Sequence, residues 1–183
     1  MKSVGEKISF DKIEDKEIKI DSGEHEVYFS QKSGFLKKIL NRETKTETKS
    51  EIKFIKYGTT SAREKSGAYL FLPDGAASDF NYKSFIRWIR VEKNGKLRNR
   101  VCINLTILLH CVELYPTVDV ASSFKTPLIN IWNVVNLREM HNFEFAMQIT
   151  SDIKNNDTFF TDLNGYQYTK RKNYEKLTIQ GNI

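Results

Sequence analysis

The residue types that most often do chemistry are present in this chain, but they are widely spaced. The three histidines are His25, His110 and His141, and none has a cysteine or an acidic pair at the spacing of a zinc site. No glycine-rich phosphate loop and no nucleophile elbow occurs in the sequence. From these residues we predict no catalytic residue and no metal ligand within the chain.

Carboxylates are plentiful, and a glycosidase would need two of them flanking the scissile bond. The candidates in apolar surroundings are Asp119, Glu144 and Asp162. Asp162 precedes a Leu-Asn-Gly turn sequence, where its side chain is expected to brace the turn backbone. Glu144 lies between two phenylalanines, where we expect an ion pair on a strand face. No two of the three stand out as a catalytic pair.

Two cysteines and two N-glycosylation sequons bear on the cellular compartment. Cys102 and Cys111 are nine residues apart, which would place them on opposite faces of one straight strand. We therefore expect no disulfide between them unless a turn intervenes. The sequons begin at Asn104 and Asn156 and would suit a lumenal protein. Asn104 falls inside an expected strand, where a glycan would be awkward.

The segment 66–75, Ser-Gly-Ala-Tyr-Leu-Phe-Leu-Pro-Asp-Gly, is the most informative stretch of the chain. It predicts a short strand over 68–72, ended by a Pro-Asp-Gly turn. Alternation puts Tyr69 and Phe71 on one face and aliphatic residues on the other, so both faces are apolar. An outer strand of a two-layer sandwich should be wet on one side. The Tyr69 face therefore needs a cover, either a loop of the same domain or a docked partner domain.

The elements that must position these residues are strands, because the dominant hydrophobic period is two. We expect Asn41–Ser50 to be a polar loop, and Ser33-Gly34, Asn94-Gly95 and Asn164-Gly165 to be turns. No segment carries a convincing amphipathic helix, and the pattern predicts an antiparallel β-sandwich. Strands are expected over 25–30, 35–40, 51–57, 68–72, 85–91, 97–114 (one bent strand or two short ones), 128–135, 143–153, 158–163, 166–171 and 176–180.

Length and charge narrow the class of protein. A chain of 183 residues suffices for one domain and buries roughly 70% of its unfolded surface. The net charge of +6 is spread among acids, and the densest basic run is 170–172, so we expect no nucleic-acid partner. The first 21 residues alternate lysine with acids and lack an apolar run, so we expect no signal or membrane segment in this chain.

The segment 66–75 and a second one, Thr158–Gln167, resemble the C-terminal β-domain of glycoside hydrolase family 38 α-mannosidases of the Golgi α-mannosidase II type. The run Lys56-Tyr57-Gly58-Thr59-Thr60 before the first segment is specific for that branch. The resemblance extends from about residue 27 to 182. It implies an incomplete all-β antiparallel sandwich of the galactose-mutarotase-like supersandwich kind over 25–183, after a charged, loosely ordered segment 1–24.

The resemblance also implies a function. Family members are retaining, zinc-dependent enzymes in which an aspartate nucleophile and a second carboxyl act on α-linked mannose. None of the zinc ligands or catalytic carboxylates has a matching position here, because they belong to a separate α/β domain. One substrate-contacting residue matches, Tyr69, whose ring and hydroxyl suit a sugar.

We therefore expect a β-sandwich portion of an α-mannosidase that processes N-glycans in the Golgi lumen, inactive by itself, with zinc and the α-mannoside bound by the full-length enzyme. Two alternatives stay open. One is a non-catalytic carbohydrate-binding or scaffold module. The other is a basic nucleic-acid binder, which would show steeply salt-dependent retention on heparin.

Overall fold

The structure is a computed structural model that describes residues 6–8, 17–59, 73–81, 85–95, 97–116 and 128–173, with only the backbone of 6–8 and 128. The chain divides into two compact units, residues 1–151 and 152–183, and each is described by itself. The described residues form strands and no α-helix, which confirms the predicted all-β class. In chain order the strands are β1 (Glu6–Ile8), β2 (Glu17–Asp21), β3 (His25–Ser30), β4 (Leu36–Asn41), β5 (Thr46–Gly58), β6 (Ser78–Asp79), β7 (Ile86–Glu92), β8 (Asn99–Leu105), β9 (Leu108–Tyr115), β10 (Leu128–Val135), β11 (Phe143–Ser151), β12 (Thr158–Asp162) and β13 (Tyr168–Lys172).

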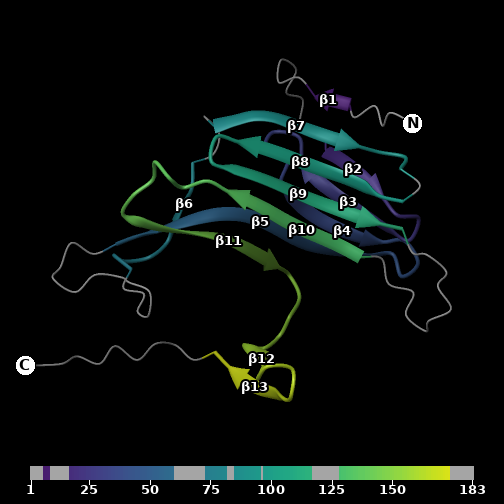
Figure 1. Ribbon diagram of the computed structural model, residues 1–183. Helices are drawn as coiled ribbons and strands as arrows, with labels where there is room; N and C mark the ends of the chain where they lie inside the picture. The colour runs from purple at the N-terminus through teal and green to yellow at the C-terminus, as the bar shows by residue number, and fades with distance from the viewer. Residues whose placement is uncertain are drawn as a thin grey trace, which may run out of the picture. The chain divides into compact units, whose positions relative to one another are not determined.

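The first unit is a sandwich of two antiparallel sheets (Figure 1). The first sheet has the order β1-β7-β8-β9-β10. The second sheet has the order β11-β5-β4-β3-β2, and β6 pairs with β5 beside this path. Neighbours in chain order mostly pair with each other, as expected for strands joined by hairpins and short turns.

The core lies between the two sheets and follows from the period of two. Alternate residues of each strand point inward, and these are almost all aliphatic or phenylalanine. Full burial of one such side chain is worth about 1.5–3 kcal/mol, so the inward residues dominate the stability of the unit. The second sheet contributes Ile18, Ile20, Val27, Phe29, Leu36, Ile52 and Phe54, and the first sheet contributes Ile89, Val91, Val101, Ile103, Leu105, Leu108, Val112 and Leu114.

A glycine at the rim of the core allows the β3–β4 connection. Gly34 has φ of +72°, and its nitrogen donates to the carbonyl oxygen of Ser30 at 2.6 Å. A Cβ atom at this position would lie 2.7 Å from Cγ1 of Ile103 on the opposite sheet. The predicted turn at Ser33-Gly34 is therefore confirmed, and both backbone angle and space require glycine there.

Most predicted strands are confirmed, and two differences have physical reasons. The region 41–50 was expected to be a loop, and this is wrong for 46–50, which belong to β5: 46–49 pair with β4, and Ser50 pairs with β11. These residues lack an apolar period because most of them are exposed, but their backbone groups still complete the ladder. Within the segment 1–24, expected to be loosely held, 17–21 form β2 with Ile18 and Ile20 buried. The domain boundary at residue 24 stays a prediction.

For the region 97–114 the sequence left open one bent strand or two short ones. The structure has two strands there, β8 and β9. Asn94 has φ of +59° in the connection between β7 and β8, which pair antiparallel, so the chain turns here as predicted. The strands expected over 68–72 and 176–180 lie outside the described residues.

The second unit contains the hairpin of β12 and β13. At its tip the nitrogen of Tyr166 donates to the carbonyl oxygen of Leu163 at 3.0 Å, and Asn164 and Gly165 have φ of +51° and +76°. This is the two-residue Asn-Gly turn that the sequence predicted. No helix in the described parts of the chain is long and apolar enough to cross a membrane.

Candidate functional site

The segment that carries Tyr69 begins and ends at one place in the sandwich. Tyr69 itself lies outside the described residues, so its predicted role is not tested. The residues on either side are described: Thr59 and Pro73 form an antiparallel bridge, and the nitrogen of Asp74 donates to the carbonyl oxygen of Gly58 at 2.8 Å. We call this closure the loop base. It lies at the end of β5, and a hydrogen bond of 3.3 Å from the nitrogen of Thr59 to the carbonyl oxygen of Asn142 joins it to the residue before β11.

Aromatic rings support the loop base from the core. Phe145 of β11 stacks on Phe54 of β5 with ring centroids 5.2 Å apart. Phe80 lies edge-on to Phe145 at 5.2 Å and stacks on Phe85 at 5.9 Å. Such ring pairs have preferred geometries and add about 0.5–1.5 kcal/mol each beyond area burial. The end of β5 is therefore held by a packed aromatic cluster.

The outer side of β5 is also apolar near the loop base. Ile55 points away from the inward-facing Phe54 and is still only 6% exposed. The cover predicted for the Tyr69 face concerns residues 68–72, which lie outside the described residues, so that prediction is not tested.

The three carboxylate candidates do not form a catalytic pair among the described residues. Asp119 lies outside them. Glu144 is exposed on β11, opposite Tyr57 of β5. Asp162 belongs to the second unit, and its Oδ2 accepts a hydrogen bond of 3.0 Å from the nitrogen of Gly165. Asp162 thus braces the turn, as predicted.

The histidines lie in three different environments. His25 of β3 is half-buried, with Nε2 3.3 Å from Nδ2 of Asn41, and His141 is exposed. His110 is fully buried in the core between the rings of Phe35 and Phe54, each with its centroid 5.5 Å away. Within the described ranges no three histidine, cysteine or acidic side chains cluster as metal ligands. These residues therefore do not fit a zinc centre.

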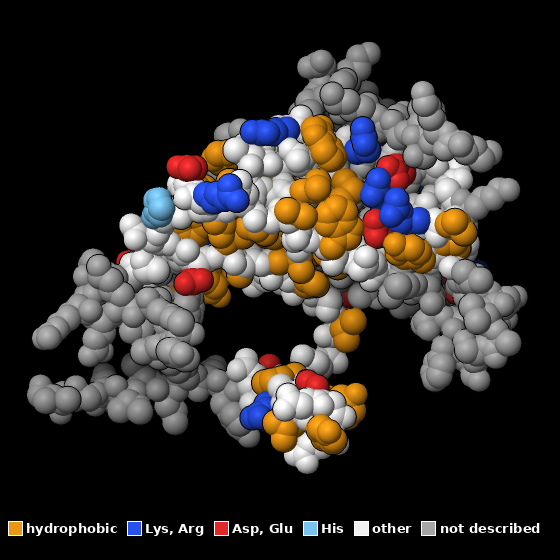
Figure 2. Space-filling view, viewed as in Figure 1, with side chains coloured by type: hydrophobic (Ala, Val, Ile, Leu, Met, Phe, Trp, Pro, Cys, Tyr) orange, Lys and Arg blue, Asp and Glu red, His pale blue; other side chains and the backbone are white. Residues whose placement is uncertain are grey.

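The outer face of the first sheet carries a polar cluster around Glu113 that sequence reasoning missed. Figure 2 shows hydrophobic side chains gathered on this face with basic and acidic side chains beside them. Strand alternation places Trp88, Tyr115 and Trp132 here, each of them half-buried.

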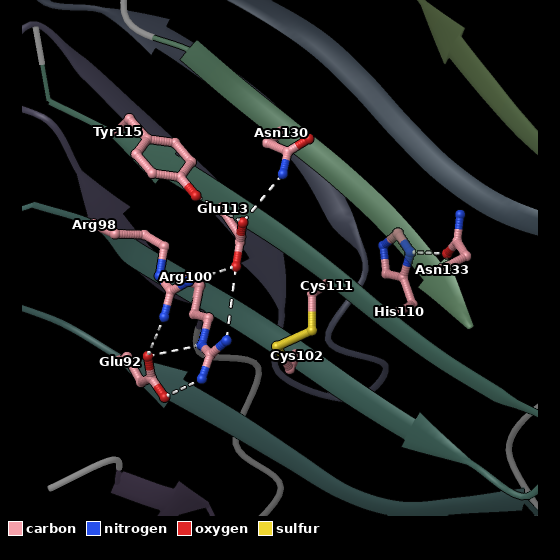
Figure 3. The surroundings of a disulfide bond; sticks show 10 residues. All are labelled: Glu92, Arg98, Arg100, Cys102, His110, Cys111, Glu113, Tyr115, Asn130 and Asn133. Atoms are coloured by element: carbon pink, nitrogen blue, oxygen red, sulfur yellow. Dashed lines mark hydrogen bonds and ion pairs between the residues drawn. A yellow bond between two sulfur atoms is a disulfide. The ribbon is translucent and has the colours of Figure 1, made fainter. Parts of the chain in front are cut away.

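A disulfide between Cys102 and Cys111 lies on the same face (Figure 3). The two cysteines are direct cross-strand partners in β8 and β9, with Cα atoms 4.2 Å apart. We expected no disulfide between these cysteines unless a turn intervenes, and a turn does intervene. The chain reverses at residues 106–107, and antiparallel pairing then brings the two residues onto one face.

Glu113 is the centre of the polar cluster, although its side chain is only 5% exposed. Its Oε1 accepts a hydrogen bond of 3.0 Å from Nη1 of Arg98, and its Oε2 accepts hydrogen bonds of 3.0 Å from Tyr115 and 3.1 Å from Asn130. Arg100 lies between Glu113 and Glu92 and donates to Glu92 at 2.7 Å (Figure 3).

This environment makes Glu113 a structural carboxylate. Burial by itself would raise the pKa of Glu113, but hydrogen bonds from Asn130, Trp132 and Tyr115 and the charge of Arg98 hold that pKa below its usual range. A general acid at neutral pH needs the opposite, a raised pKa. The sequence signal was a period-two pattern, Arg98-x-Arg100 at the start of β8 and Glu113-x-Tyr115 at the end of β9. It is recognisable only once the register of the two strands is known.

A hollow of about 320 Å³ lies at one end of the sandwich, beside β2 and the β7–β8 connection. Its charged lining side chains are Lys19, Asp21 and Lys93, so it offers one carboxylate. The carbonyl oxygen of Asp21 accepts a hydrogen bond of 2.7 Å from Nδ2 of Asn99, which ties the two sheets together here. The hollow does not supply the two carboxyls of a glycosidase.

Comparison with known proteins gives one consistent match. The sequence profile described as "Glycosyl hydrolases family 38 C-terminal domain" matches residues 20–180. The chain is 36% identical to mouse (Mus musculus) Alpha-mannosidase 2 over 154 residues, which is 83% of this chain and 13% of the relative. It is 36% identical to human (Homo sapiens) Alpha-mannosidase 2 over 151 residues, 82% of this chain and 13% of the relative. With Alpha-mannosidase 2 of Drosophila melanogaster the identity is 32% over 167 residues, 91% and 14% of the two chains. The matched region thus spans about an eighth of the length of these relatives.

Proposed function

This chain belongs to glycosyl hydrolase family 38, as a C-terminal domain of that family, and from this membership we propose that it is the β-sandwich portion of a retaining, zinc-dependent α-mannosidase acting on N-glycans. The observation that carries the proposal is the family match over residues 20–180 together with the similarity to proteins named Alpha-mannosidase 2. The two catalytic carboxyls would come from the α/β domain of the whole enzyme.

We assign Tyr69 to the mannose pocket of that enzyme. The loop base supports this role, because it holds Thr59 and Pro73 together and so restricts where the intervening residues can reach. The ring pairs Phe54–Phe145 and Phe80–Phe145 hold β5 and β11 together on the strands that lead to the loop base. A tyrosine there would offer its ring to a sugar face and its hydroxyl to a sugar hydroxyl, across the boundary between the two domains.

Zinc would act in the other domain, where it would polarise and orient the sugar. The described residues of this chain do not fit the metal, so no step is assigned here to a metal ligand. The site of action would be the Golgi lumen. The Cys102–Cys111 disulfide supports a lumenal location, because structural disulfides persist mainly in oxidising compartments.

The first test is activity of the isolated chain. The 183-residue protein, supplied with zinc and a chromogenic α-mannoside, should show no turnover above background. Turnover that depends on zinc and is abolished by EDTA would refute the assignment of the reactive groups to a separate domain.

The second test is Tyr69→Phe in a full-length enzyme that carries this domain. The change removes one hydroxyl, so turnover should fall while the melting temperature is kept. Tyr166→Phe is a matched control, because Tyr166 is 92% exposed at the hairpin tip. Full activity combined with a collapse in melting temperature would show that Tyr69 is only a core residue.

A second candidate function is a carbohydrate-binding module without catalysis. The observation that favours it is the outer face of the first sheet, where strand register places Trp88, Trp132 and Tyr115. Aromatic rings of this kind stack on sugar faces. Saturable quenching of tryptophan fluorescence of the isolated chain by manno-oligosaccharides, lost in Trp88→Ala, would favour this function. Unchanged fluorescence at millimolar sugar would reject it.

A further inference from the structure

The two sequons of the chain differ in where the fold places them. An N-glycosylation acceptor is an asparagine followed two residues later by serine or threonine, and it lies in surface loops. Asn104-Leu105-Thr106 and Asn156-Asp157-Thr158 both satisfy the sequence rule. The sequence rule alone therefore does not distinguish the two sequons, and the proposed function assigns a role to neither.

Asn156 lies in an exposed tight turn at the start of the second unit. The nitrogen of Thr158 donates to the carbonyl oxygen of Asn155 at 2.9 Å, and the two central residues, Asn156 and Asp157, have φ of +50° and +56°. Both central residues are exposed. The turn thus presents the Asn156 side chain to solvent, and that side chain makes no hydrogen bond to another described residue.

The threonine of this sequon belongs to the same turn. Its Oγ1 donates to the carbonyl oxygen of Asn156 at 3.3 Å, so hydroxyl and acceptor residue stay close together. Asn155 holds the turn from the other side, because its Oδ1 accepts from the nitrogen of Asp157 at 3.2 Å.

Asn104 has the opposite surroundings. It lies inside β8, a central strand of the first sheet, and its Cα partners are Trp88 on one side and Leu109 on the other. The residues before and after it, Ile103 and Leu105, are buried in the core. Its side chain is half-buried on the outer face, where a glycan would have to lie over the sheet and the rings beside it.

The Cys102–Cys111 disulfide is an independent observation that bears on the compartment. A disulfide indicates maturation in an oxidising lumen, which is also where oligosaccharides are transferred to nascent chains. The inference needs only passage through that lumen, and it does not depend on mannosidase activity.

We propose that Asn156 is an N-glycosylation site of this chain and that Asn104 is not. In the transfer, the side-chain nitrogen of Asn156 forms a bond to the anomeric carbon of an oligosaccharide activated as a polyisoprenyl diphosphate. The bond from that carbon to the diphosphate oxygen breaks, the diphosphate leaves with the electron pair, and the amide loses one proton to solvent. No oxidant or reductant is required.

The experiment expresses the 183-residue chain behind a cleavable secretory signal in cultured animal cells. Gel mobility of total cell protein and medium is compared before and after digestion with peptide N-glycosidase. The wild type should lose a single step on digestion. Asn156→Gln and Thr158→Ala should lack this step, and Asn104→Gln and the neighbouring control Asn155→Gln should keep it. Thr158→Ser should keep at least part of it, because serine preserves the sequon.

Three outcomes would overturn the proposal: a wild type without an enzyme-sensitive step, a step that survives Asn156→Gln, or a second step that disappears in Asn104→Gln. Two variants remove the same sequon through different residues, so poor folding of one does not hide the answer. The readout is mass, and it is independent of the turnover measurements that test the mannosidase assignment.

Discussion

Acidification should destabilise the first unit through His110, and the structure gives the size of the effect. Burial lowers the pKa of His110, and the hydrogen bond to Asn133 opposes this shift only in part. Nδ1 lies 2.7 Å from Oδ1 of Asn133, which requires the proton on Nδ1. Nε2 is buried and has no partner among the described residues. A second proton there would place an unpaired charge between two phenylalanine rings.

The sign follows from linkage. The folded-state pKa of His110 is below the unfolded value of about 6.5, so the unfolded chain binds the extra proton first. The contribution of neutral His110 to stability is complete above the unfolded pKa and is lost as the pH falls from that value toward the folded pKa. One pH unit below the unfolded value, the free energy of unfolding falls by at most about 1.4 kcal/mol, the limit for one proton that only the unfolded chain binds.

The measurement is urea unfolding, followed by tryptophan fluorescence at constant ionic strength at pH 7.5 and 5.5. The change in free energy between the two pH values should be smaller in His110→Phe than in the wild type, by up to about 1.4 kcal/mol. Comparing the variant with the wild type cancels the titration of all other groups. Val112→Ala, in the same strand and core, should lower stability by roughly 1–3 kcal/mol at both pH values and keep the wild-type dependence. Equal pH dependence in His110→Phe and wild type would refute the reasoning.

Three further predictions concern the stability of the sandwich. Replacing both Cys102 and Cys111 by alanine should lower the free energy of unfolding by about 2.5 kcal/mol, from the loop-closure entropy of a disulfide spanning nine residues, measured by urea unfolding. Gly34→Ala should cost about 2–4 kcal/mol, because it combines a left-handed φ with a clash against a core isoleucine, as measured by thermal unfolding. Glu113→Gln should cost about 2 kcal/mol at pH 7 by losing charge-assisted hydrogen bonds. This cost should shrink in urea unfolding at pH 3, because the lowered pKa of Glu113 makes its stabilisation complete above about 4.5 and lost as the pH falls through the folded value.

Each of these predictions has its own control. Dithiothreitol should destabilise the wild type and leave the double alanine variant unchanged; a response of both would exclude the disulfide as the cause. The control for Gly34→Ala is Gly23→Ala. Gly23 has φ of +90°, and a Cβ added there would meet no atom within 4 Å, so this variant should show only the backbone cost of about 1–2 kcal/mol. Equal losses for the two glycine variants would rule out the clash. A cost of Glu113→Gln that is the same at pH 7 and pH 3 would contradict an ionised Glu113.

Local signals predicted much of the fold. The strand over 25–30 and the Asn164-Gly165 turn were both predicted with the bounds that the structure has. These features depend on neighbouring residues, because side chains alternate along a strand and a two-residue turn requires positive φ at both positions. The polar stretch 46–50 was missed for the same reason: it pairs through its backbone and has no apolar period to reveal it.

The candidate site was predictable only in part. The segment around Tyr69 and the family resemblance came from sequence motifs, and the family match confirms the resemblance. The role of Tyr69 stays a prediction. The closure of Thr59 with Pro73 could not be predicted, because it joins residues on either side of a segment whose length alone specifies no geometry.

The amino-acid order by itself determined the strand class, the turns and the family, because each depends on short patterns along the chain. The tertiary structure decided which residues meet: Cys102 with Cys111, Arg98 with Glu113, and His110 with the rings of Phe35 and Phe54. Those meetings follow from strand register and sheet packing, which sum many weak contacts over the whole sandwich. They also set the pKa values of Glu113 and His110, because burial and hydrogen bonding exist only once the sheets have paired.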